Sequence, residues 1–371
     1  MSVTASDAVV LTEERVLDGG RRLAVATLNS ERSLNSLSLE MVELLLPSMR
    51  RWAADPAVVA VFLQGAGEKA FCAGGDVRRI CLRVREHGID DGYAQQFFTE
   101  EYRLDYLIHT YPKPVIVWGE GIVMGGGIGL LCGASHRVVT TNARLAMPEI
   151  TIGLYPDVGG SHVLSRLPER LGLFIGMTGV HLTASDARHV GLATDVLAPA
   201  RREAVLAALT ALPWSADAGE HAAQISAVLA AEAAAASAAP LQQQAEAIAA
   251  RTAGDSLAEI HANLTAPTDD PWLARTAETL AKGSPTSAAL IHRQWQRGRH
   301  MSLADVFREE LILSTQCARH PDFIEGVRAL LVDKDNTPRW QPATLAEVTA
   351  DWIDGHYVAP WSGAHPLEDL A

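Results

Sequence analysis

The chain is poor in cysteine and lysine and has no long hydrophobic run, and each shortage excludes a class of protein. Its 371 residues include four widely spaced cysteines without a CxxC pair, which is typical of reduced core thiols rather than a disulfide scaffold. With a net charge of −13 and four lysines, the chain lacks the basic surface that nucleic-acid binding requires. No apolar run is long enough to span a membrane, and residues 1–16 lack the basic start and apolar core of a signal peptide. These shortages predict a cytoplasmic globular protein.

Several standard functional motifs are also missing. The run Gly125–Leu130 fails the GxGxxG fingerprint of dinucleotide binding, because its sixth position is leucine. No GxxxxGK[ST] phosphate loop occurs. Ser161 lies outside any GxSxG nucleophile elbow, and its neighbour His162 is expected to be structural. The 13 histidines form no HExxH motif and no spaced cluster with cysteine, so we expect no metal and no separate cofactor.

The composition and the hydrophobic pattern indicate an α/β protein. Hydrophobic residues make up 48% of the chain and charged residues 20%, as in an ordinary globular protein long enough for two lobes. Strand-like and helix-like runs alternate as far as about Leu197, which predicts a layered α/β fold. The expected strands are 9–16, 22–28, 58–63, 114–118 and 137–140, and the expected helices are 39–54 and 93–108. Beyond Pro199 the chain is alanine-rich, and helices are expected over 205–209 and 221–239 and again from Ser284.

The stretch from Gly119 to Ser161 is the most informative part of the chain. Three consecutive glycines, Gly125–Gly127, stand at the start of an apolar run that is typical of a buried helix. Glycines there leave backbone N–H groups unshielded and biased positive by the helix dipole, which suits an oxygen that becomes negative during a reaction. Two acids follow on loop-like backbone, Glu149 and Asp157, and could supply acid–base or nucleophilic chemistry. The pattern indicates an acyl-transfer or enolate site.

Simpler interpretations exist for several of these residues. The pair Gly74–Gly75 could free another backbone N–H for a ligand, but on its own it indicates a tight turn. Asp157 follows a proline, where an aspartate is most often a turn former or a helix cap. Glu101 lies beside Glu100 on an amphipathic helix and is by default part of a solvated face. Glu149 is harder to dismiss, because it is a charged residue within an otherwise apolar segment.

Three motifs in this order resemble the crotonase (enoyl-CoA hydratase/isomerase) superfamily, and most of all its 3-hydroxyisobutyryl-CoA hydrolase branch. They are AFCAGGD at 70–76, MGGGIGL at 124–130 and MPEITIGLYPDVGG at 147–160. The likeness extends to FFTEEYRL around Glu101 and to the segments 284–294 and 320–349. It covers residues 58–197 and the last third of the chain well, and the alanine-rich middle poorly.

The resemblance implies a particular domain organisation. Residues 1–200 would form a crotonase-like spiral of ββα turns, and residues 201–371 a mostly helical C-terminal region. Within that region we expect alanine-rich helices at 201–280, family-like helices at 281–349 and a tail at 350–371. Members of the superfamily form trimers or pairs of trimers, which implies a homo-oligomer.

The resemblance also implies roles for individual residues. By position, the backbone N–H groups of Gly75 and Gly126 would hold a thioester carbonyl oxygen, and a side chain at either should damage rate more than folding. Glu149 matches an acid that acts in both the hydratases and the hydrolase branch, and Asp157 matches the second acid of that branch. Gly129 stands where hydratases carry their other catalytic glutamate, so hydration by the two-glutamate route looks disabled. Thioester hydrolysis needs a single carboxylate besides the two N–H donors.

Further residues would contact the substrate. Glu101 matches a glutamate of the branch that would hold the acyl hydroxyl. Gly74 and Asp76 belong to the first glycine motif, and Lys69 precedes it as a candidate contact for CoA phosphates. The resemblance thus implies hydrolysis of 3-hydroxyisobutyryl-CoA or a close short hydroxyacyl-CoA, in valine breakdown, with CoA as part of the substrate. The alternatives are an enoyl-CoA hydratase or isomerase and a non-catalytic acyl-CoA-binding relative.

Overall fold

The computed structural model describes residues 8–235 and 237–371. The first seven residues, part of the segment that argued against a signal peptide, lie outside this range. The described chain divides into two compact units that alternate along the sequence. Unit 1 comprises the segments up to Gly75, Arg103–Leu145 and Leu182–Gln243, and unit 2 comprises Asp76–Tyr102, Ala146–His181 and Gln244–Ala371.

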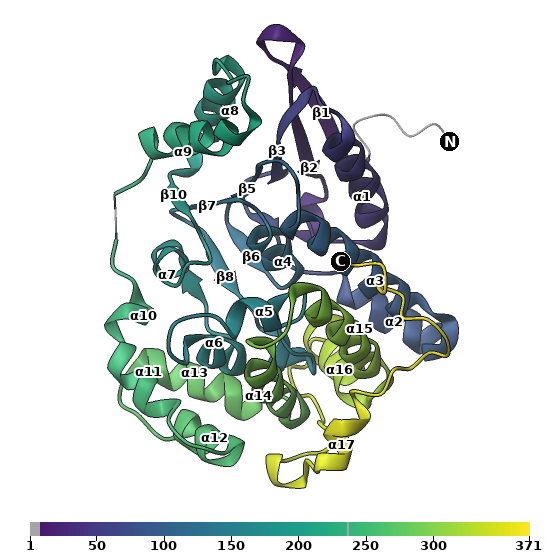
Figure 1. The fold of residues 1–371 in the computed structure, drawn as a ribbon. Helices are drawn as coiled ribbons and strands as arrows, with labels where there is room; N and C mark the ends of the chain where they lie inside the picture. Colours follow the sequence, from purple (N-terminus) through teal and green to yellow (C-terminus); the bar gives the residue numbers. More distant parts are fainter. Residues whose placement is uncertain (1–7, 236) are drawn as a thin grey trace. The chain divides into compact units, whose positions relative to one another are not determined.

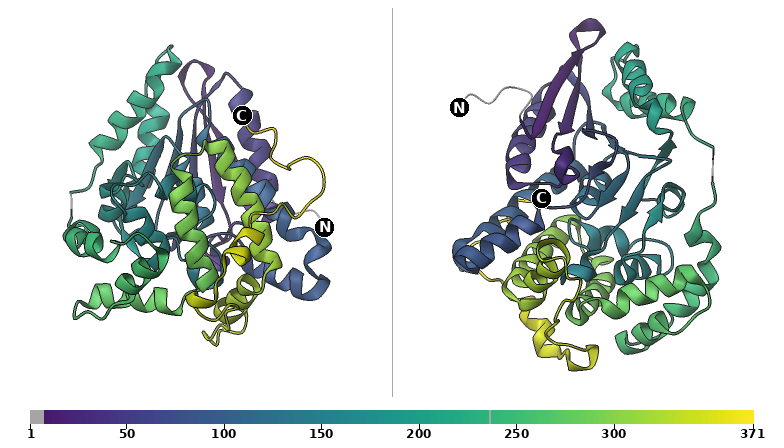
Figure 2. Two further views of the ribbon diagram at one scale, coloured as in Figure 1. Left: turned by 60° about the horizontal axis from the view of Figure 1, so that its bottom comes forward. Right: turned by 180° about the vertical axis from the view of Figure 1, so that it is seen from behind.

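Unit 1 is built on a six-stranded sheet with the order β1-β2-β3-β5-β7-β10. The strands are β1 (Val10–Val16), β2 (Arg22–Leu28), β3 (Val58–Gly65), β5 (Val115–Gly119), β7 (His136–Thr140) and β10 (Asp195–Leu197). The β1–β2 hairpin is antiparallel and forms one edge of the sheet, drawn in purple in Figures 1 and 2. Every other pairing in this sheet is parallel, which requires crossover connections between the strands.

A second, four-stranded sheet has the order β4-β6-β8-β9, with β4 (Ala70–Cys72), β6 (Ile122–Met124), β8 (Arg144–Ala146) and β9 (Leu182–Thr183). The helices of unit 1 are α1 (Leu39–Ala54), α4 (Gly126–Cys132), α7 (Ala184–His189), α8 (Arg202–Ala211), α9 (His221–Ala231) and α10 (Pro240–Gln243). One hydrophobic core joins the large sheet to α8 and α9, through residues such as Phe62, Trp118 and Leu206. Burial of this apolar area is the main stabilising contribution within the unit.

Unit 2 is mostly helical. Its helices are α2 (Val77–His87), α5 (Gly160–Leu164), α6 (Leu171–Thr178), α11 (Ala245–Arg251), α12 (Leu257–Thr265), α13 (Pro271–Lys282), α14 (Pro285–Gly298), α15 (Leu303–Arg319), α16 (Pro321–Val327) and α17 (Ala350–Gly355). Helix α3 (Tyr93–His109) contributes its first part to unit 2 and its last part to unit 1. Figure 1 draws α13 to α16 in green, and α15 packs against α16.

Local sequence signals predicted many of these elements correctly. The hairpin around Asp18–Gly20 is present, and the hydroxyl of Ser38 caps α1 by accepting from the amide of Met41 at 3.1 Å. Thr183 and Asp186 form a reciprocal capping box at the start of α7. Pro47 lies inside α1, which has the length expected from the sequence and runs from Leu39 to Ala54.

The alanine-rich middle departs from the prediction. The helix expected over 221–239 ends at Ala231, although alanine is the strongest helix former. Instead, Ala233 forms a β-bridge with Leu197, and the amide of Ala234 donates to the carbonyl of Val196 at 2.9 Å. Pairing with the edge of β10 therefore overrides the local helix propensity.

The expected α/β class is confirmed, with two sheets followed by a helical C-terminal region. From Arg202 onwards the described part of the chain contains helices and connecting segments but no strand. The domain boundary expected at residue 200 stays a prediction, and the two compact units are a separate description of the packing.

Candidate functional site

Unit 1 brings two glycine loops together: the first glycine loop, Ala73–Gly75, and the second, Gly125–Gly127. Gly74 has φ +108° and Gly125 has φ 47°, a region of backbone space that glycine occupies without a steric penalty. A Cβ added to Gly74 would lie 3.9 Å from the backbone nitrogen of Gly126. The two loops are therefore neighbours, as the sequence suggested.

Close backbone packing explains the third glycine of the second loop. A Cβ on Gly127 would lie 2.4 Å from the carbonyl oxygen of Cys72 in β4, closer than non-bonded atoms approach. Only a residue without a side chain lets the start of α4 lie so close to β4. Gly126 is the first residue of α4, and N–H groups in the first turn of a helix have no acceptor within the helix. Such groups are suited to binding a ligand oxygen.

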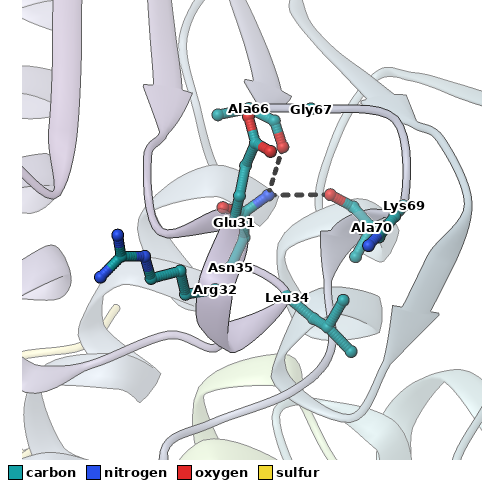
Figure 3. A pocket seen from close by; sticks show the side chains of 8 residues that line it. All are labelled: Glu31, Arg32, Leu34, Asn35, Ala66, Gly67, Lys69 and Ala70. Carbon is teal, nitrogen blue, oxygen red and sulfur yellow. Dashed lines mark hydrogen bonds between the residues drawn. The ribbon is translucent and has the colours of Figure 1, made fainter.

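A pocket of about 190 Å³ lies next to the first glycine loop along the chain (Figure 3). Its lining residues are Glu31, Arg32, Leu34, Asn35, Ala66, Gly67, Lys69 and Ala70. The buried Asn35 side chain donates to the carbonyls of Ala66 at 3.0 Å and Ala70 at 2.8 Å, and so ties the walls together. Lys69 lines this pocket, and its contact with CoA phosphates stays a prediction. Arg32 and Asn35, in the segment after β2, were not predicted from the sequence to line a pocket.

Asp76 has a defined structural role. Its side chain caps α2 by accepting from the backbone N–H of Arg79 at 3.1 Å. Capping by aspartate stabilises a helix start through that hydrogen bond and the helix dipole. A contact between Asp76 and substrate stays a prediction.

Unit 2 contains the acidic residues of the candidate site. Glu149 begins a short 3-10 helix, Glu149–Ile152, and is buried. Its Oε2 atom accepts no hydrogen bond from any described residue. Burial raises the pKa of Glu149 well above its ordinary range, and the nearby charge of Asp157 raises it further. A buried carboxyl group with a raised pKa and an oxygen without a partner is typical of a catalytic acid or base.

The short helix that carries Glu149 is held by close contacts with the C-terminal segments. The amide of Ser284 donates to the carbonyl of Ile150 at 3.0 Å. Gly153 ends the short helix with φ +72°, and a Cβ there would lie 2.3 Å from the carbonyl carbon of Asp322. A Cβ on Gly326 would lie 2.5 Å from the carbonyl carbon of Ile152. Backbone contacts of this kind fix the position of Glu149.

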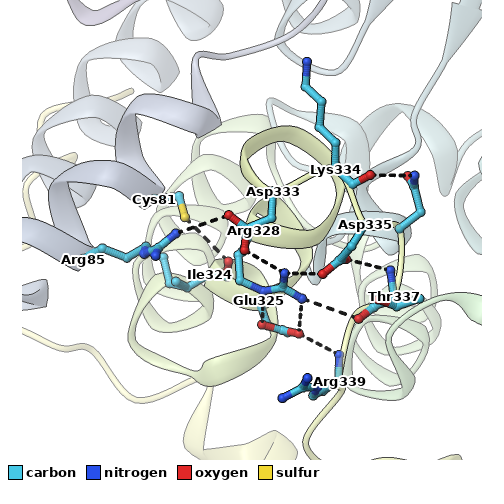
Figure 4. A network of polar contacts seen from close by, with 11 residues as sticks. Cys81, Arg85, Ile324, Glu325, Arg328, Asp333, Lys334, Asp335, Thr337 and Arg339 are labelled. Carbon is cyan, nitrogen blue, oxygen red and sulfur yellow. Dashed lines mark hydrogen bonds and ion pairs between the residues drawn. The ribbon is translucent and has the colours of Figure 1, made fainter.

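A charged network stabilises the segment that follows α16 (Figure 4). Arg328 pairs with Glu325 at 2.8 Å, with Asp333 at 2.9 Å and with Asp335 at 2.6 Å. These hydrogen bonds raise the pKa of Arg328. Glu325 and Arg328 of this network lie on either side of Gly326 in the sequence. Lys334 extends away from the other side chains in Figure 4.

Asp157 is more than a turn residue in this structure. It is 4% exposed, and its Oδ2 atom accepts from the hydroxyl of Tyr102 at 2.5 Å. Burial raises the pKa of Asp157 to about 6, while the hydrogen bond from Tyr102 acts in the opposite direction. Its titration therefore falls close to neutral pH, where proton transfer is efficient.

Glu101 corrects one expectation from the sequence. The default of a solvated face is wrong, because Glu101 is 2% exposed and lies on a buried part of α3. Its substrate-binding role stays a prediction. Three further residues near Asp157 or its loop were not predicted from the sequence: Tyr102, Glu310 and Ser314. A glutamate at a helical position flanked by buried Phe307 and Leu311 was the available signal for Glu310.

The raised pKa of Asp157 makes a prediction for stability. The folded-state pKa is about 6 and the ordinary value is 3.8, so this group favours folding fully below about pH 4. That contribution is lost as pH rises through 6. Asn does not titrate, so Asp157→Asn should not lose this contribution. We therefore expect its free energy of unfolding, relative to that of the wild type, to increase between pH 4 and pH 8. Urea unfolding of both proteins across this range measures the difference, and a difference independent of pH would contradict it.

Two further observations concern metals and membranes. Across the described ranges, no group of three or more His, Cys, Asp or Glu side chains is arranged to hold a metal ion. None of the helices in the described part of the chain is long and apolar enough to cross a lipid bilayer.

The chain is similar in sequence to proteins of a known family. Residues 23–357 match the family model described as "Enoyl-CoA hydratase/isomerase". The chain is 41% identical over 337 residues to "3-hydroxyisobutyryl-CoA hydrolase, mitochondrial" of Danio rerio, covering 90% of this chain and 86% of that protein. The human protein of the same name is 35% identical, covering 93% of this chain and 88% of its own length.

Solved structures agree with the fold. A carnitinyl-CoA dehydratase from Mycobacterium thermoresistibile superimposes with a TM-score of 0.84 at 35% identity, covering 96% of this chain and 98% of that one. An enoyl-CoA hydratase from Rhodobacter sphaeroides 2.4.1 gives a TM-score of 0.82 at 32% identity, covering 94% and 97%. The crotonase-like fold expected from the motifs is thereby confirmed.

Proposed function

Because this chain belongs to the enoyl-CoA hydratase/isomerase family, we propose that it hydrolyses a short 3-hydroxyacyl-CoA, such as 3-hydroxyisobutyryl-CoA, to the free acid and CoA. The observation that carries the proposal is the buried Glu149, which has a raised pKa, lies near Asp157, and has one oxygen that accepts no hydrogen bond from the residues described. Gly129, where hydratases of the family have their second glutamate, favours hydrolysis over hydration. The names of the relatives support the same substrate class.

In the proposed reaction, the amides of Gly75 and Gly126 bind the thioester carbonyl oxygen as it becomes negative. Losing one such donor typically costs about 3–4 kcal/mol of transition-state stabilisation. As a general base, Glu149 accepts a proton from water while the water oxygen bonds to the carbonyl carbon. As a nucleophile, Glu149 instead bonds to that carbon and forms an anhydride, which water then opens.

Both routes break the carbon–sulfur bond: the base route breaks it when the tetrahedral water adduct collapses, and the nucleophile route breaks it when the anhydride forms, before water opens the anhydride. The electron pair of that bond leaves with sulfur, and the CoA thiolate takes up a proton. Asp157 is the proposed donor of this proton or the group that orients the water, because its pKa near 6 allows it to exchange protons at neutral pH. A single turnover in ¹⁸O-labelled water distinguishes the routes: the base route labels the acid product at once, whereas attack of water on the Glu149 carbonyl of the anhydride leaves the label in the protein.

In the same proposal, Glu101 and the pocket lined by Lys69 determine which substrates bind. The buried Glu101 would accept a hydrogen bond from the 3-hydroxyl group, and such a buried acceptor discriminates strongly against substrates that lack the hydroxyl. The pocket beside Lys69 would take part of the CoA moiety, with Gly74 shaping the approach to the thioester. In this role the enzyme would act in valine breakdown. A cytoplasmic location and a trimer or hexamer stay predictions; the relatives carry "mitochondrial" in their names.

The deciding experiment is a thiol-release assay with short acyl-CoAs that carry or lack a 3-hydroxyl group. Hydrolysis liberates CoA, which a thiol reagent detects, and the 3-hydroxylated substrates should be turned over fastest. Loss of crotonyl-CoA absorbance without thiol release would instead identify a hydratase. Binding of acyl-CoA without turnover of any substrate would identify a non-catalytic relative.

Asp157→Asn should lower kcat by about 10²-fold and change KM little, because the side chain keeps its shape but loses its exchangeable proton. The amide oxygen of Asn can still accept from Tyr102. Stopped-time thiol assays measure kcat and KM, and calorimetric titration measures CoA binding. Asp305→Asn, at an exposed position on α15, is the control. Equal losses in kcat and in CoA binding would reduce Asp157 to a structural turn.

A further inference from the structure

The side chain of Glu310, on helix α15, contacts the loop that carries Asp157. Glu310 is fully buried, and its Oε2 atom accepts from the amide of Gly159 at 2.8 Å. Its Oε1 atom accepts from the amide of Ser161 at 3.0 Å. Both oxygens of one side chain thus hold the backbone two and four residues after Asp157.

The loop held in this way has an unusual backbone. Val158 has φ 53°, and a β-branched residue occupies this left-handed region only under constraint. Gly159 follows with φ 81°. Such a conformation persists only where the surroundings determine it, and the two hydrogen bonds to Glu310 supply that constraint.

A second anchor lies one helical turn further along α15. Ser314 is buried, and its hydroxyl lies 2.6 Å from the hydroxyl of Tyr102 and 3.0 Å from that of Tyr155. Tyr102 in turn donates to Asp157, and Tyr155 donates to the backbone carbonyl of Glu310 at 3.0 Å. One face of α15 therefore holds both the backbone of the loop and, through Tyr102, the carboxylate of Asp157.

We propose that Glu310 is a positioning residue that, together with Ser314, fixes the loop 157–161 so that Asp157 is presented in a single orientation for the reaction. This inference rests on the proposed function only in taking Asp157 to act on the thioester. Glu310 itself touches no reacting atom.

The simpler alternative is that Glu310 only caps the short helix α5. Burying a carboxylate is costly, and a Ser, Thr or Asn side chain can cap a helix without a charge. Here burial raises the pKa of Glu310 to about 8, with the two amide hydrogen bonds acting in the opposite direction and the charge of Asp157 raising it further. Tyr102 and Tyr155 also interact electrostatically with Glu310. Capping α5 does not require an ionisable side chain, whereas Glu310 is ionisable and interacts with Asp157. Capping alone therefore does not explain a glutamate at this position.

The test compares Glu310→Gln with Glu309→Gln, its neighbour on α15, which pairs with Arg297 near the surface. Glutamine presents one acceptor and one donor, so one of the two amide hydrogen bonds is lost. We expect kcat of Glu310→Gln to fall by about 10²-fold with KM unchanged, the size of loss that a small misplacement of a catalytic group causes. Glu309→Gln should match the wild type.

Two further readouts separate positioning from a purely structural role. The wild-type pH profile of kcat should have an inflection near pH 8, where Glu310 ionises beside Asp157, and Glu310→Gln should lack this inflection. Hydrogen exchange should be faster at the amides of Gly159 and Ser161 in Glu310→Gln, and unchanged in Glu309→Gln. Exchange is measured without substrate, so it judges the positioning even if the wild type releases no thiol.

Two outcomes would overturn the inference. The first is a kcat of Glu310→Gln within twofold of the wild type. The second is a loss of kcat in which the pH profile is retained and exchange at the two amides is unchanged. If Glu310→Gln fails to fold, Ser314→Ala decides, because it removes only the hydroxyl between Tyr102 and Tyr155. It should lower kcat severalfold with KM unchanged, and wild-type kinetics would then overturn the proposal.

Discussion

Glu149→Gln is expected to lower thiol release from a 3-hydroxyacyl-CoA by about 10³-fold, within the range that general acid–base catalysis contributes. The reason is chemical: an amide neither accepts a proton from water at neutral pH nor attacks a carbonyl carbon as a carboxylate does. The substitution keeps the shape of the side chain, so the contacts of Ile150 with Ser284 and of Gly153 with Asp322 are preserved. Steady-state thiol assays at saturating substrate measure the effect.

The stability of Glu149→Gln should not fall with its activity. The pKa of Glu149 is raised in the folded protein, so its ionisation opposes folding as pH rises above the ordinary value of 4.5. Glutamine removes that cost, and the melting temperature of Glu149→Gln at pH 8 should equal or exceed that of the wild type. Glu246→Gln, at an exposed position on α11, is the control and should change neither quantity. Unchanged turnover in Glu149→Gln would remove Glu149 from the mechanism.

Gly126→Pro should lower kcat by about 10²–10³-fold, the loss expected when one oxyanion donor is removed. Proline lacks the N–H group, and it is tolerated at the first position of a helix, which Gly126 occupies in α4. The change therefore removes the proposed donor at a position where the helix itself has no use for it. Thiol assays give kcat, and thermal melting shows how far folding is affected.

A substitution at the adjacent Gly127 should affect stability rather than rate, in contrast to Gly126→Pro. Gly127→Ala keeps every N–H group, but its Cβ would lie 2.4 Å from the carbonyl oxygen of Cys72. Overpacking of this kind costs about 1–3 kcal/mol of the free energy of unfolding. Gly127→Ala should thus lose stability, while Gly126→Pro loses mainly rate. If Gly126→Pro retains wild-type kcat, the amide of Gly126 does not hold the thioester oxygen.

Local signals explain why the two glycine loops and Glu149 could be singled out from the sequence. The glycines of both loops are needed for backbone conformations and close approaches that a side chain would prevent, and this leaves a visible pattern at 74–75 and 125–127. Glu149 was conspicuous because a charged residue in an apolar segment is rare. Helix caps such as Ser38 and the Thr183–Asp186 box are encoded within four residues.

Other features depend on residues far away in the chain and could not be predicted in this way. Glu101 and Glu100 are neighbours with the same chemistry, and the surroundings of α3 decide that Glu101 is buried. The segment after Ala231 has a strong helix propensity, yet it extends along β10 because tertiary hydrogen bonds compete successfully with that propensity.

The sequence by itself determined the family, the α/β class, the two glycine loops and the acids at 149 and 157, because each is written in short motifs whose meaning is local. Only the tertiary structure decided which side chains surround Asp157. Tyr102 and Glu310 lie 208 residues apart in sequence, and they share this environment because α3 and α15 pack within unit 2. Burial and pKa depend on the neighbours that folding supplies, and no local pattern specifies them.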